Sequence, residues 1–198
     1  MDPLAAAAIA LGAGWASGLN TYAALLVLGI AQASGLVVLP HDLQVLGSPW
    51  VLGVVVLLFA LNFFADKIPY IDSINDALHT FVRVPAGALL AFGAADQLGP
   101  EAAAVAALLG GTIAAGSHVA KTGSRALINA SPEPFSNIAA SLATDALVVV
   151  GLVLALTHPI VFLCLLLGFV ALLVWLLPRL LRLAALPFRR LMASKKRT

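Results

Sequence analysis

The chain contains little charge for its length. Its 198 residues include eleven lysines and arginines and nine aspartates and glutamates, so charged residues make up 10% of the chain, whereas a soluble domain carries about 25%. Hydrophobic residues make up 62%. A soluble fold cannot bury so much apolar surface, so this composition excludes a soluble globular domain. It predicts an all-α polytopic membrane protein, because helices satisfy their own backbone hydrogen bonds within lipid.

Cysteine is also scarce, and no targeting signal precedes the first apolar run. Cys164 is the single cysteine, which excludes an intrachain disulfide, and we interpret it as a small packing residue. The N-terminus lacks the basic region of a secretory signal. We therefore expect the first apolar run to be retained as a membrane span.

The apolar residues form six runs separated by polar segments. A membrane-spanning helix needs about 20 mostly apolar residues. The run 84–97 is too short alone, but Ser73 and Asp76 have the spacing of a capping box, so we expect a helix that starts near 73 and is kinked at Pro85. Residues 1–178 form a single transmembrane domain in this interpretation. The six expected spans are 4–33, 50–65, 73–97, 102–121, 136–157 and 159–178.

The basic residues predict an orientation. If the N-terminus is cytoplasmic, the connections 66–83 and 121–135 and the tail 179–198 are cytoplasmic too, and all eleven bases lie inside. We expect a protein of the bacterial cytoplasmic (inner) membrane with both termini in the cytoplasm. The basic tail should contact anionic lipid headgroups rather than nucleic acid. Its seven bases are Arg179, Arg182, Arg189, Arg190, Lys195, Lys196 and Arg197.

Two segments of the chain are similar to each other. Residues 5–20 and 103–118 are identical at seven of sixteen positions, and Asn20 aligns with His118. The first of the corresponding spans would run outward and the fourth inward, which predicts a 3+3 inverted repeat of 1–97 and 98–178, the architecture of many secondary transporters. The alternative is that the shared glycines and alanines only allow helices to pack closely.

Polar residues within the spans are candidates for an ion site. Asp145 lies about 15 Å into its span, where a carboxylate costs about 2.5–3.5 kcal/mol. It must therefore be protonated, paired or in contact with water, and it shares a helix face with Asn137, Ser141 and Thr144. The alternative role is hydrogen bonding between helices. The predicted proton or cation site consists of Asp145, Asn137, Asn20 and Asn62.

The connection 66–83 and the end of the fourth span carry most of the remaining charge. Asp76, His79 and Arg83 have i, i+3, i+7 spacing, as have His118, Lys121 and Arg125. Isoleucine, valine and phenylalanine lie between the charges of 66–83, so we expect this segment to pack against the bundle as an interfacial or re-entrant element. A solvated loop is the alternative.

These bases would converge at a basic mouth that faces the cytoplasm. Lys67, Arg83, Lys121 and Arg125 would form it, and acidic residues that include Glu133 would balance it. Such a mouth fits an anionic or zwitterionic group, including a phosphate headgroup. The predicted substrate-binding residues are Asp66, Lys67, Asp72, Asp76, Arg83, His118, Lys121 and Arg125.

Several of these residues also carry a family resemblance. The segments 65–90 and 116–145 resemble the bacterial and plastid membrane family of domain of unknown function 4126, over nearly the whole chain up to about residue 160. Thr144 stands where the resemblance implies an acidic residue. The resemblance implies an integral membrane protein and no particular activity. It rests on Asp66, Lys67, Pro69, Asp72, Asn75, Asp76, Thr80, Arg83, Gly87, His118, Lys121, Arg125, Asn137 and Asp145.

These observations favour transport over catalysis. The chain has no G-x-S-x-G, H-E-x-x-H, C-x-x-C or P-loop motif, so we expect no enzyme, cofactor or metal. We expect a small transporter or translocase for an anionic or zwitterionic solute or lipid headgroup, coupled to a proton or cation. The alternatives are a membrane scaffold or assembly partner and, less favoured, an intramembrane lipid-modifying enzyme. A homo-oligomer is compatible with all three.

Overall fold

The computed structural model describes residues 2–68, 71–128 and 134–176, without the side chains of residues 72, 73, 126, 127 and 134. The regular elements in these ranges are all helices. The chain divides into two compact units, Met1–Cys164 and Leu165–Thr198. In order, the elements are α1 (Pro3–Ala33), the 3-10 helix η1 (His41–Gly47), α2 (Pro49–Ala65), α3 (Ile71–Ala95), the 3-10 helix η2 (Asp96–Leu98), α4 (Pro100–Ile128), α5 (Pro134–Thr157) and a helix over Pro159–Leu176.

The helices confirm the predicted class. Within the described ranges, five helices are long and apolar enough to cross a membrane. The number is six if η1 and α2, which meet at an angle of 71°, count as one bent span. The protein is therefore an all-α polytopic membrane protein.

The distribution of side chains agrees with this class. Large apolar residues such as Leu61, Phe81 and Leu108 are exposed on the outside of the bundle. Small residues such as Ala16 and polar residues such as Asn20 are buried inside it. A soluble helical protein has the reverse pattern, so the outer surface of this bundle fits hydrocarbon rather than water.

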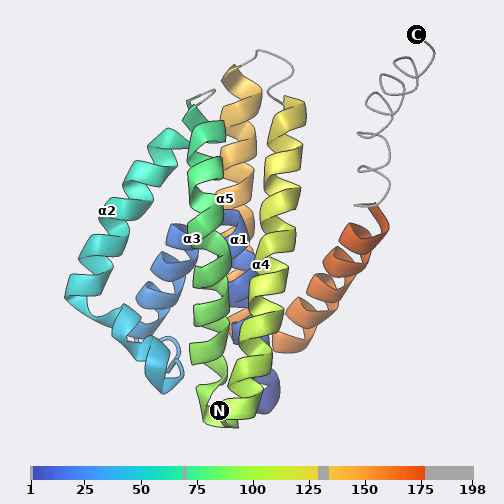
Figure 1. The fold of residues 1–198 in the computed structure, drawn as a ribbon. Helices are drawn as coiled ribbons and strands as arrows, with labels where there is room; N and C mark the ends of the chain where they lie inside the picture. The colour runs from blue at the N-terminus through green and yellow to red at the C-terminus, as the bar shows by residue number, and fades with distance from the viewer. Residues whose placement is uncertain (1, 69–70, 129–133, 177–198) are drawn as a thin grey trace. The chain divides into compact units, whose positions relative to one another are not determined.

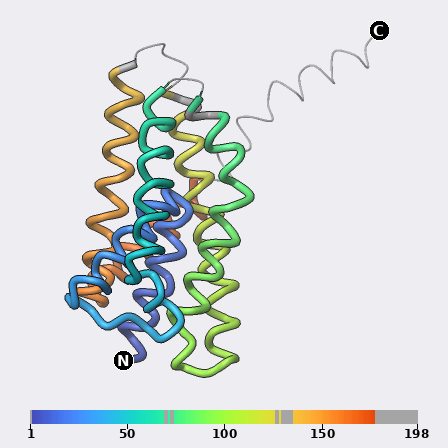
Figure 2. The backbone as a smooth tube through the Cα atoms, turned by 90° about the vertical axis from the view of Figure 1, so that its left-hand side faces the viewer, coloured from blue at the N-terminus to red at the C-terminus, as the bar shows by residue number. Residues whose placement is uncertain are grey.

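Helix α1 is broken at its centre. Asn20 has extended backbone angles (φ −155°, ψ 99°) inside an otherwise helical segment. In Figures 1 and 2 the chain climbs to the middle of the bundle and then turns back, so both ends of α1 lie at the same end of the bundle. Contacts agree with this path, because Ala7 lines an apolar cavity together with Leu98, and Leu43, which follows α1, lies against Gly93. Helix α1 is thus a re-entrant element of two half-helices.

The small residues of α1 allow this packing. A Cβ atom at Gly14 would come within 2.7 Å of the Gly110 Cα, and one at Gly18 would overlap Ala114 O and Ser117 Oγ. Helix α1 therefore packs against α4 almost backbone to backbone, as small residues permit in membranes. This supports the close-packing alternative for the two similar segments.

The structure does not confirm the inverted repeat. Helix α1 breaks at Asn20, whereas α4 continues as a helix past the matching residue His118. Of the two forms expected for the segment 66–83, interfacial or re-entrant, a re-entrant loop is not observed in the described residues. Helix α3 begins at Ile71 and continues through Pro85 as one helix, so residues 71–83 form its first half. The re-entrant element of this fold is α1 instead.

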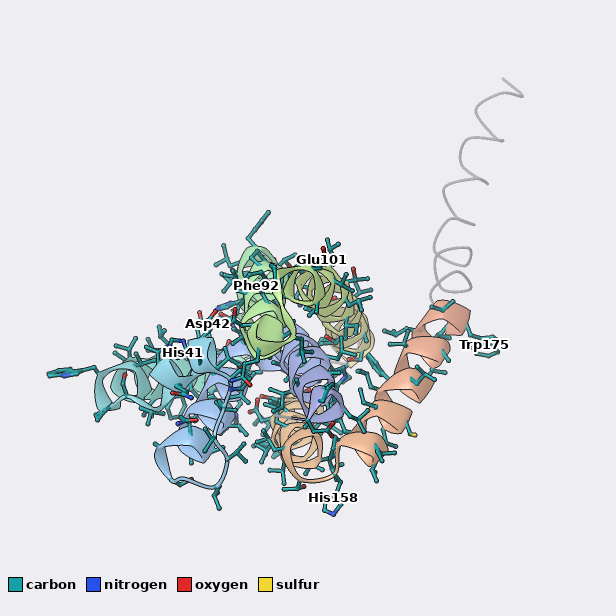
Figure 3. All side chains as sticks on the ribbon, turned by 90° about the horizontal axis from the view of Figure 1, so that it is seen from below. His41, Asp42, Phe92, Glu101, His158 and Trp175 are labelled. Atoms are coloured by element: carbon teal, nitrogen blue, oxygen red, sulfur yellow. The ribbon has the colours of Figure 1, made fainter. Side chains whose placement is uncertain are left out.

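The two ends of the bundle differ in charge. Figure 3 shows the end that carries His41, Asp42, Glu101 and His158. The four lysines and arginines of the described ranges lie elsewhere: Lys67 follows the end of α2, Arg83 is in the middle of α3, and Lys121 and Arg125 are in the last third of α4. The start of α1 lies at the end shown in Figure 3. The start of α1 therefore lies away from the segments next to 66–83 and 121–135, whereas six full spans would place them at one end, because α1 turns back at Asn20.

Candidate functional site

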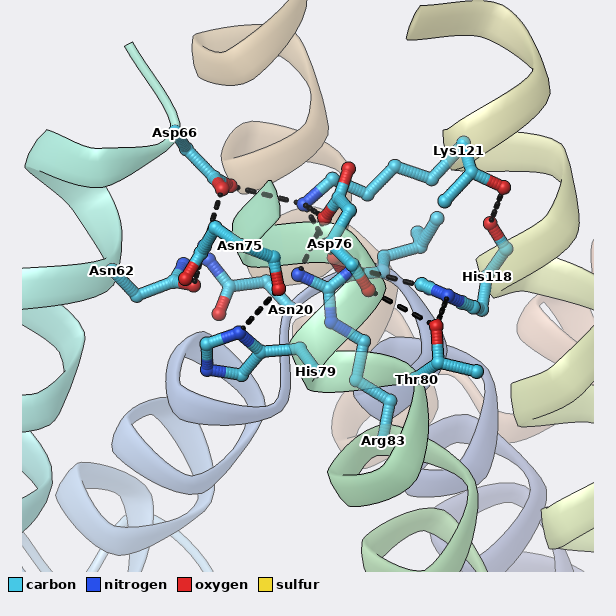
Figure 4. Close-up of polar contacts among 12 residues, drawn as sticks. Asn20, Asn62, Asp66, Asn75, Asp76, His79, Thr80, Arg83, His118 and Lys121 are labelled. Atoms are coloured by element: carbon cyan, nitrogen blue, oxygen red, sulfur yellow. Dashed lines mark hydrogen bonds and ion pairs between the residues drawn. The ribbon is translucent and has the colours of Figure 1, made fainter. Parts of the chain in front are cut away.

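Five charged residues form a buried ion-pair cluster between α2, α3 and α4 (Figure 4). Arg83 Nη2 lies 2.8 Å from Asp76 Oδ1, and Lys121 Nζ lies 3.0 Å from Asp66 Oδ2 and 3.3 Å from Asp76 Oδ1. Arg125 lies 3.3 Å from Asp66 Oδ2 and 3.6 Å from Asp76 Oδ2. Each side chain is at most 3% exposed. We call these five residues the ion-pair cluster.

Helical spacing explains why the cluster forms. Asp76 and Arg83 are seven residues apart on α3, and Lys121 and Arg125 are four apart on α4, so each pair lies on one helix face. The two faces meet, and Asp66 joins them from the end of α2. The two sets of residues with i, i+3, i+7 spacing on α3 and α4 therefore contact each other in the structure. The expectation of an open basic mouth is wrong, because three of its four bases are buried and paired with carboxylates.

Asp66 is the acid at the edge of the spans. Burial alone would raise its pKa, but Lys121 and Arg125 more than offset this effect and hold the pKa below its ordinary value. Asn75 Nδ2 donates to Asp66 Oδ1 (3.0 Å) and to Asn62 Oδ1 (2.9 Å). Asn62 therefore contacts the ion-pair cluster through Asn75. This corrects the grouping of Asn62 with Asp145.

Lys67 is set apart from the three buried bases. Its ammonium donates to Phe63 O at 3.1 Å and lies 2.8 Å from the centre of the Phe63 ring. Burial lowers its pKa, while the fields of Asp145 and Asp66 act in the opposite direction. Lys67 thus lies beside the cluster, near enough to Asp145 for their charges to interact.

His118 links α4 to α3 through a defined tautomer. Arg83 Nη1 lies 3.2 Å from His118 Nδ1, and Thr80 Oγ1 lies 2.7 Å from His118 Nε2. A guanidinium only donates, so Nδ1 accepts. Thr80 already donates its hydroxyl proton to Asp76 O, so Nε2 carries the histidine proton. The contacts define a neutral His118 that holds Arg83 toward Asp76.

Four further polar residues complete the network, and our sequence analysis did not assign them to the site. Ser17 Oγ donates to Arg83 O at 2.9 Å, and Tyr22 OH lies 3.1 Å from His79 Nε2. Asn75 and Thr80 have the contacts given above. The sequence could have indicated Asn75, because it lies four residues before His79 and therefore on the same face of α3. Ser17 and Tyr22 gave no such signal, because their partners on α3 are more than 50 residues away in the chain.

The break in α1 lies beside the cluster. Lys121 Nζ donates to Leu19 O at 3.0 Å, at the carboxyl end of the first half-helix. Asn20 Oδ1 accepts from Ala23 N at 3.1 Å and so caps the second half-helix, while Asn20 Nδ2 donates to Asp145 Oδ1 at 2.8 Å. A cation at a helix C-terminus and an anion near a helix N-terminus are the favourable arrangement for each helix dipole.

Asp145 faces the interior of the bundle and is only 9% exposed. The structure thus brings together Asn20 and Asp145, two of the four residues that the sequence analysis grouped in a proton or cation site. Asn137 is also buried, two helical turns before Asp145 on α5. Its side-chain atoms have no hydrogen-bond partner in the described protein, and neither has Asp145 Oδ2.

Some predicted residues lie outside the part of the chain whose side chains the structure describes. They are Asp72, Glu133 and the tail bases from Arg179 to Arg197. Among the described side chains, no group of three or more histidine, cysteine, aspartate or glutamate residues is placed to hold a metal ion. The described site presents both charge signs to one buried region, which suits binding of a polar group and movement of charge.

Comparison with known proteins identifies the family of this chain. No curated protein and no solved structure matches the chain. The model of one protein family matches residues 7–179, a range that includes all of the described site. The chain belongs to the family of the domain of unknown function DUF4126.

Proposed function

We propose that the protein is a membrane transporter or translocase for a small anionic or zwitterionic solute or lipid headgroup, coupled to a proton or cation. One observation carries the proposal: the ion-pair cluster and Asp145 are buried beside the break of a re-entrant helix. Ionisable groups at membrane depth are costly and mark substrate and ion pathways. Broken helices form the binding sites of many secondary transporters.

The energetics of the ion-pair cluster support a functional role. A buried ion pair is often no more stable than the apolar side chains that could replace it. Five buried charges are therefore a poor means of holding helices together. They are a good means of binding a substrate that itself carries charge.

Each sign has a role in this proposal. Arg83, Lys121 and Arg125 bind the anionic group, with the guanidinium forks matching carboxylate or phosphate oxygens. Asp66 and Asp76 neutralise these bases when no substrate is bound, and they bind the cationic group of a zwitterion. Substrate binding then exchanges one set of ion pairs for another, so the bases are never left uncompensated in a low dielectric.

We place the protein in the cytoplasmic membrane with its basic half toward the cytoplasm, as the positive-inside rule requires. The site would then be reached from the cytoplasmic side. The basic residues after 178 would contact anionic lipid headgroups. The partners of this protein would be lipids and a small substrate, and no nucleic acid.

Reconstitution into liposomes tests the proposal. One assay measures uptake of radiolabelled inorganic phosphate, and another measures movement of a fluorescent zwitterionic phospholipid between leaflets. We expect one assay to give protein-dependent flux. Arg83→Lys retains the charge but not the fork, and it should lower that flux about ten- to a hundredfold, the value of one or two charge-assisted hydrogen bonds. Glu101→Gln, at the opposite end of the bundle, is the matched control and should leave flux unchanged.

Other outcomes would favour other functions. Folded protein that moves neither probe, and that copurifies with one stoichiometric membrane partner, would favour a scaffold or assembly role. Chemical conversion of the lipid probe would favour a lipid-modifying enzyme. Equal flux in wild type and Arg83→Lys would remove the cluster from the transport site.

A further inference from the structure

Helix α5 carries a line of buried polar side chains that the ion-pair cluster does not include. Asn137, Ser141 and Asp145 follow one another at four-residue spacing and so share a helix face. Their exposures are 1%, 0% and 9%. Asn137 Oδ1 and Nδ2, Ser141 Oγ and Asp145 Oδ2 have no hydrogen-bond partner in the described protein. Buried polar atoms rarely remain without a partner, so this line is built to contact something other than protein.

The line begins close to one end of the bundle and finishes at the break in α1. Asn137 is the fourth residue of α5, at the end that carries the α4–α5 connection. Asp145 lies two turns deeper, where its Oδ1 accepts from Asn20. The line therefore connects one end of the bundle to the centre of the fold.

The spacing of the side chains indicates what they contact. Residues four apart on a helix are separated by about 6 Å along its axis, and Asn137 and Asp145 by about 12 Å. A metal ion bound by oxygen atoms needs its ligands within about 2.6 Å, so one ion cannot contact both ends of the line. In contrast, a gap of about 6 Å is the length of two consecutive hydrogen bonds through one water molecule.

We propose that Asn137, Ser141 and Asp145 form a hydrated proton path from the α4–α5 end of the bundle to the break in α1, with Asp145 as its protonation site. This rests on the proposed function and names the coupling ion as the proton. A hydronium ion of the water path transfers a proton to Asp145 Oδ2: one O–H bond of the hydronium breaks, an O–H bond to Oδ2 forms, and the products are a water molecule and a neutral carboxylic acid. Release reverses the step, and no other bond changes.

Protonation at this position acts directly on the break in α1. The ionised Asp145 accepts a hydrogen bond from Asn20, which caps the second half-helix, and its negative charge is favoured by the N-terminal end of that half-helix. A neutral carboxylic acid loses that electrostatic attraction and accepts a weaker hydrogen bond. The proton thus weakens one of the contacts that hold the two half-helices in place.

The charged groups around Asp145 are few. Helix α1 contains no acidic or basic residue between Pro3 and Ala33, and α5 contains none besides Asp145. Among the described residues, the charged groups that act on Asp145 are Lys67 and Asp66 beyond the end of α2 and Lys121 on α4. Two of these groups are cations and one is a carboxylate.

Infrared difference spectroscopy on the purified protein in lipid nanodiscs tests the proposal without a substrate. Lowering the pH should produce the C=O stretch of a protonated carboxyl group. That band should be lost in Asp145→Asn and shifted but still titratable in Asp145→Glu. The matched control is Glu101→Gln, which removes an exposed carboxyl at the other end of the bundle and should retain the band. If Asp145→Asn does not fold, the shift of the band in Asp145→Glu is sufficient to assign the band to residue 145.

The path has its own test. After a rapid drop in pH, the band should rise more slowly in Ser141→Ala than in wild type. Thr144→Val is the control on the neighbouring turn, because Thr144 already donates to Ala140 O, and it should leave the rate unchanged. Equal rates in the two variants overturn the path, and a band that persists in Asp145→Asn overturns the protonation site.

Two further results keep this inference separate from the proposed function. If sodium at fixed pH removes the band in wild type, the site binds a cation in competition with the proton, and the assignment of the proton as coupling ion is overturned. If Asp145 titrates as expected but neither phosphate nor lipid moves in liposomes, the proton site stands and the proposed transport function fails.

Discussion

Replacement of Asp76 by asparagine is the sharpest test of the buried ion-pair cluster. Asp76 is 2% exposed and faces three bases: Arg83 at 2.8 Å, Lys121 at 3.3 Å and Arg125 at 3.6 Å. Asparagine retains the volume but removes the charge. Loss of one partner from a buried ion pair costs about 3–5 kcal/mol, because the charge that remains is uncompensated. We expect Asp76→Asn to lose stability of that size.

A matched change on the basic side makes the test quantitative. Lys121→Met leaves two guanidinium groups facing two carboxylates within the ion-pair cluster, and the thioether fills much of the space of the lysine stem. The loss is then mainly that of the hydrogen bonds to Asp66 and Leu19 O, about 1–3 kcal/mol.

The assay is reversible unfolding in mixed micelles, with helix content as the signal. We expect Asp76→Asn to lose more free energy of unfolding than Lys121→Met. Equal losses, or a loss below about 1 kcal/mol for Asp76→Asn, would mean that the carboxylate is not the counter-ion of the three bases and would refute the reasoning.

Three other predictions concern packing, capping and pH. Gly18→Ala, whose Cβ would overlap Ala114 O, should lower the unfolding free energy by about 1–3 kcal/mol, whereas Gly53→Ala, with open space around it, should leave it unchanged or slightly raised. Asn20→Ala should cost about 1 kcal/mol through the lost helix cap, and proteolysis should detect the loosened α1. Folding lowers the pKa of Asp66 from 3.8, so the stability that its carboxylate contributes is complete above pH 3.8 and is lost as the pH falls toward the folded-state pKa. The unfolding free energy of wild type should therefore fall on acidification. Asp66→Asn should lack this part of the fall, and an acid titration of both proteins measures the difference.

Much of the helix pattern could be predicted from the sequence. The runs 50–65 and 136–157 correspond closely to α2 and α5, and the capping residues near 73 placed the start of α3 within two residues. Hydropathy fixes such elements because each must match the bilayer along its whole length. The inward position of Asp145 was predictable for the same reason, since a carboxylate facing lipid is too costly.

The break in α1 could not be predicted in this way. The segment 4–33 is mostly apolar and contains no charged residue and no proline, so its sequence predicts one uninterrupted span. The contacts that favour the break come from Lys121 and Asp145, more than 100 residues away in the chain. The prediction of a basic mouth was wrong for a related reason. Helical spacing shows which residues share a face, but it does not show whether that face contacts water or another helix.

The path of α1 changes the expected side of the N-terminus and leaves the expected sides of the other connections as they were. Lysine and arginine still favour the cytoplasm, so the half of the bundle with Lys67 and Lys121 should be cytoplasmic. Because α1 turns back at Asn20, the start of α1 should then lie on the opposite side, together with His41 and Glu101. We therefore expect the N-terminus to lie outside the cytoplasm.

Cysteine labelling in intact cells decides this point. In a Cys164→Ser background, a cysteine at Asp2 should react with a membrane-impermeant maleimide, as should one at His41, whereas a cysteine at Ile68 should react only after the cells are opened. Reaction of Asp2→Cys and Ile68→Cys from the same side would mean that α1 crosses the membrane. The break at Asn20 would then be a kink within a span, and the pairing of Asn20 with Asp145 would no longer mark the inner end of a re-entrant helix.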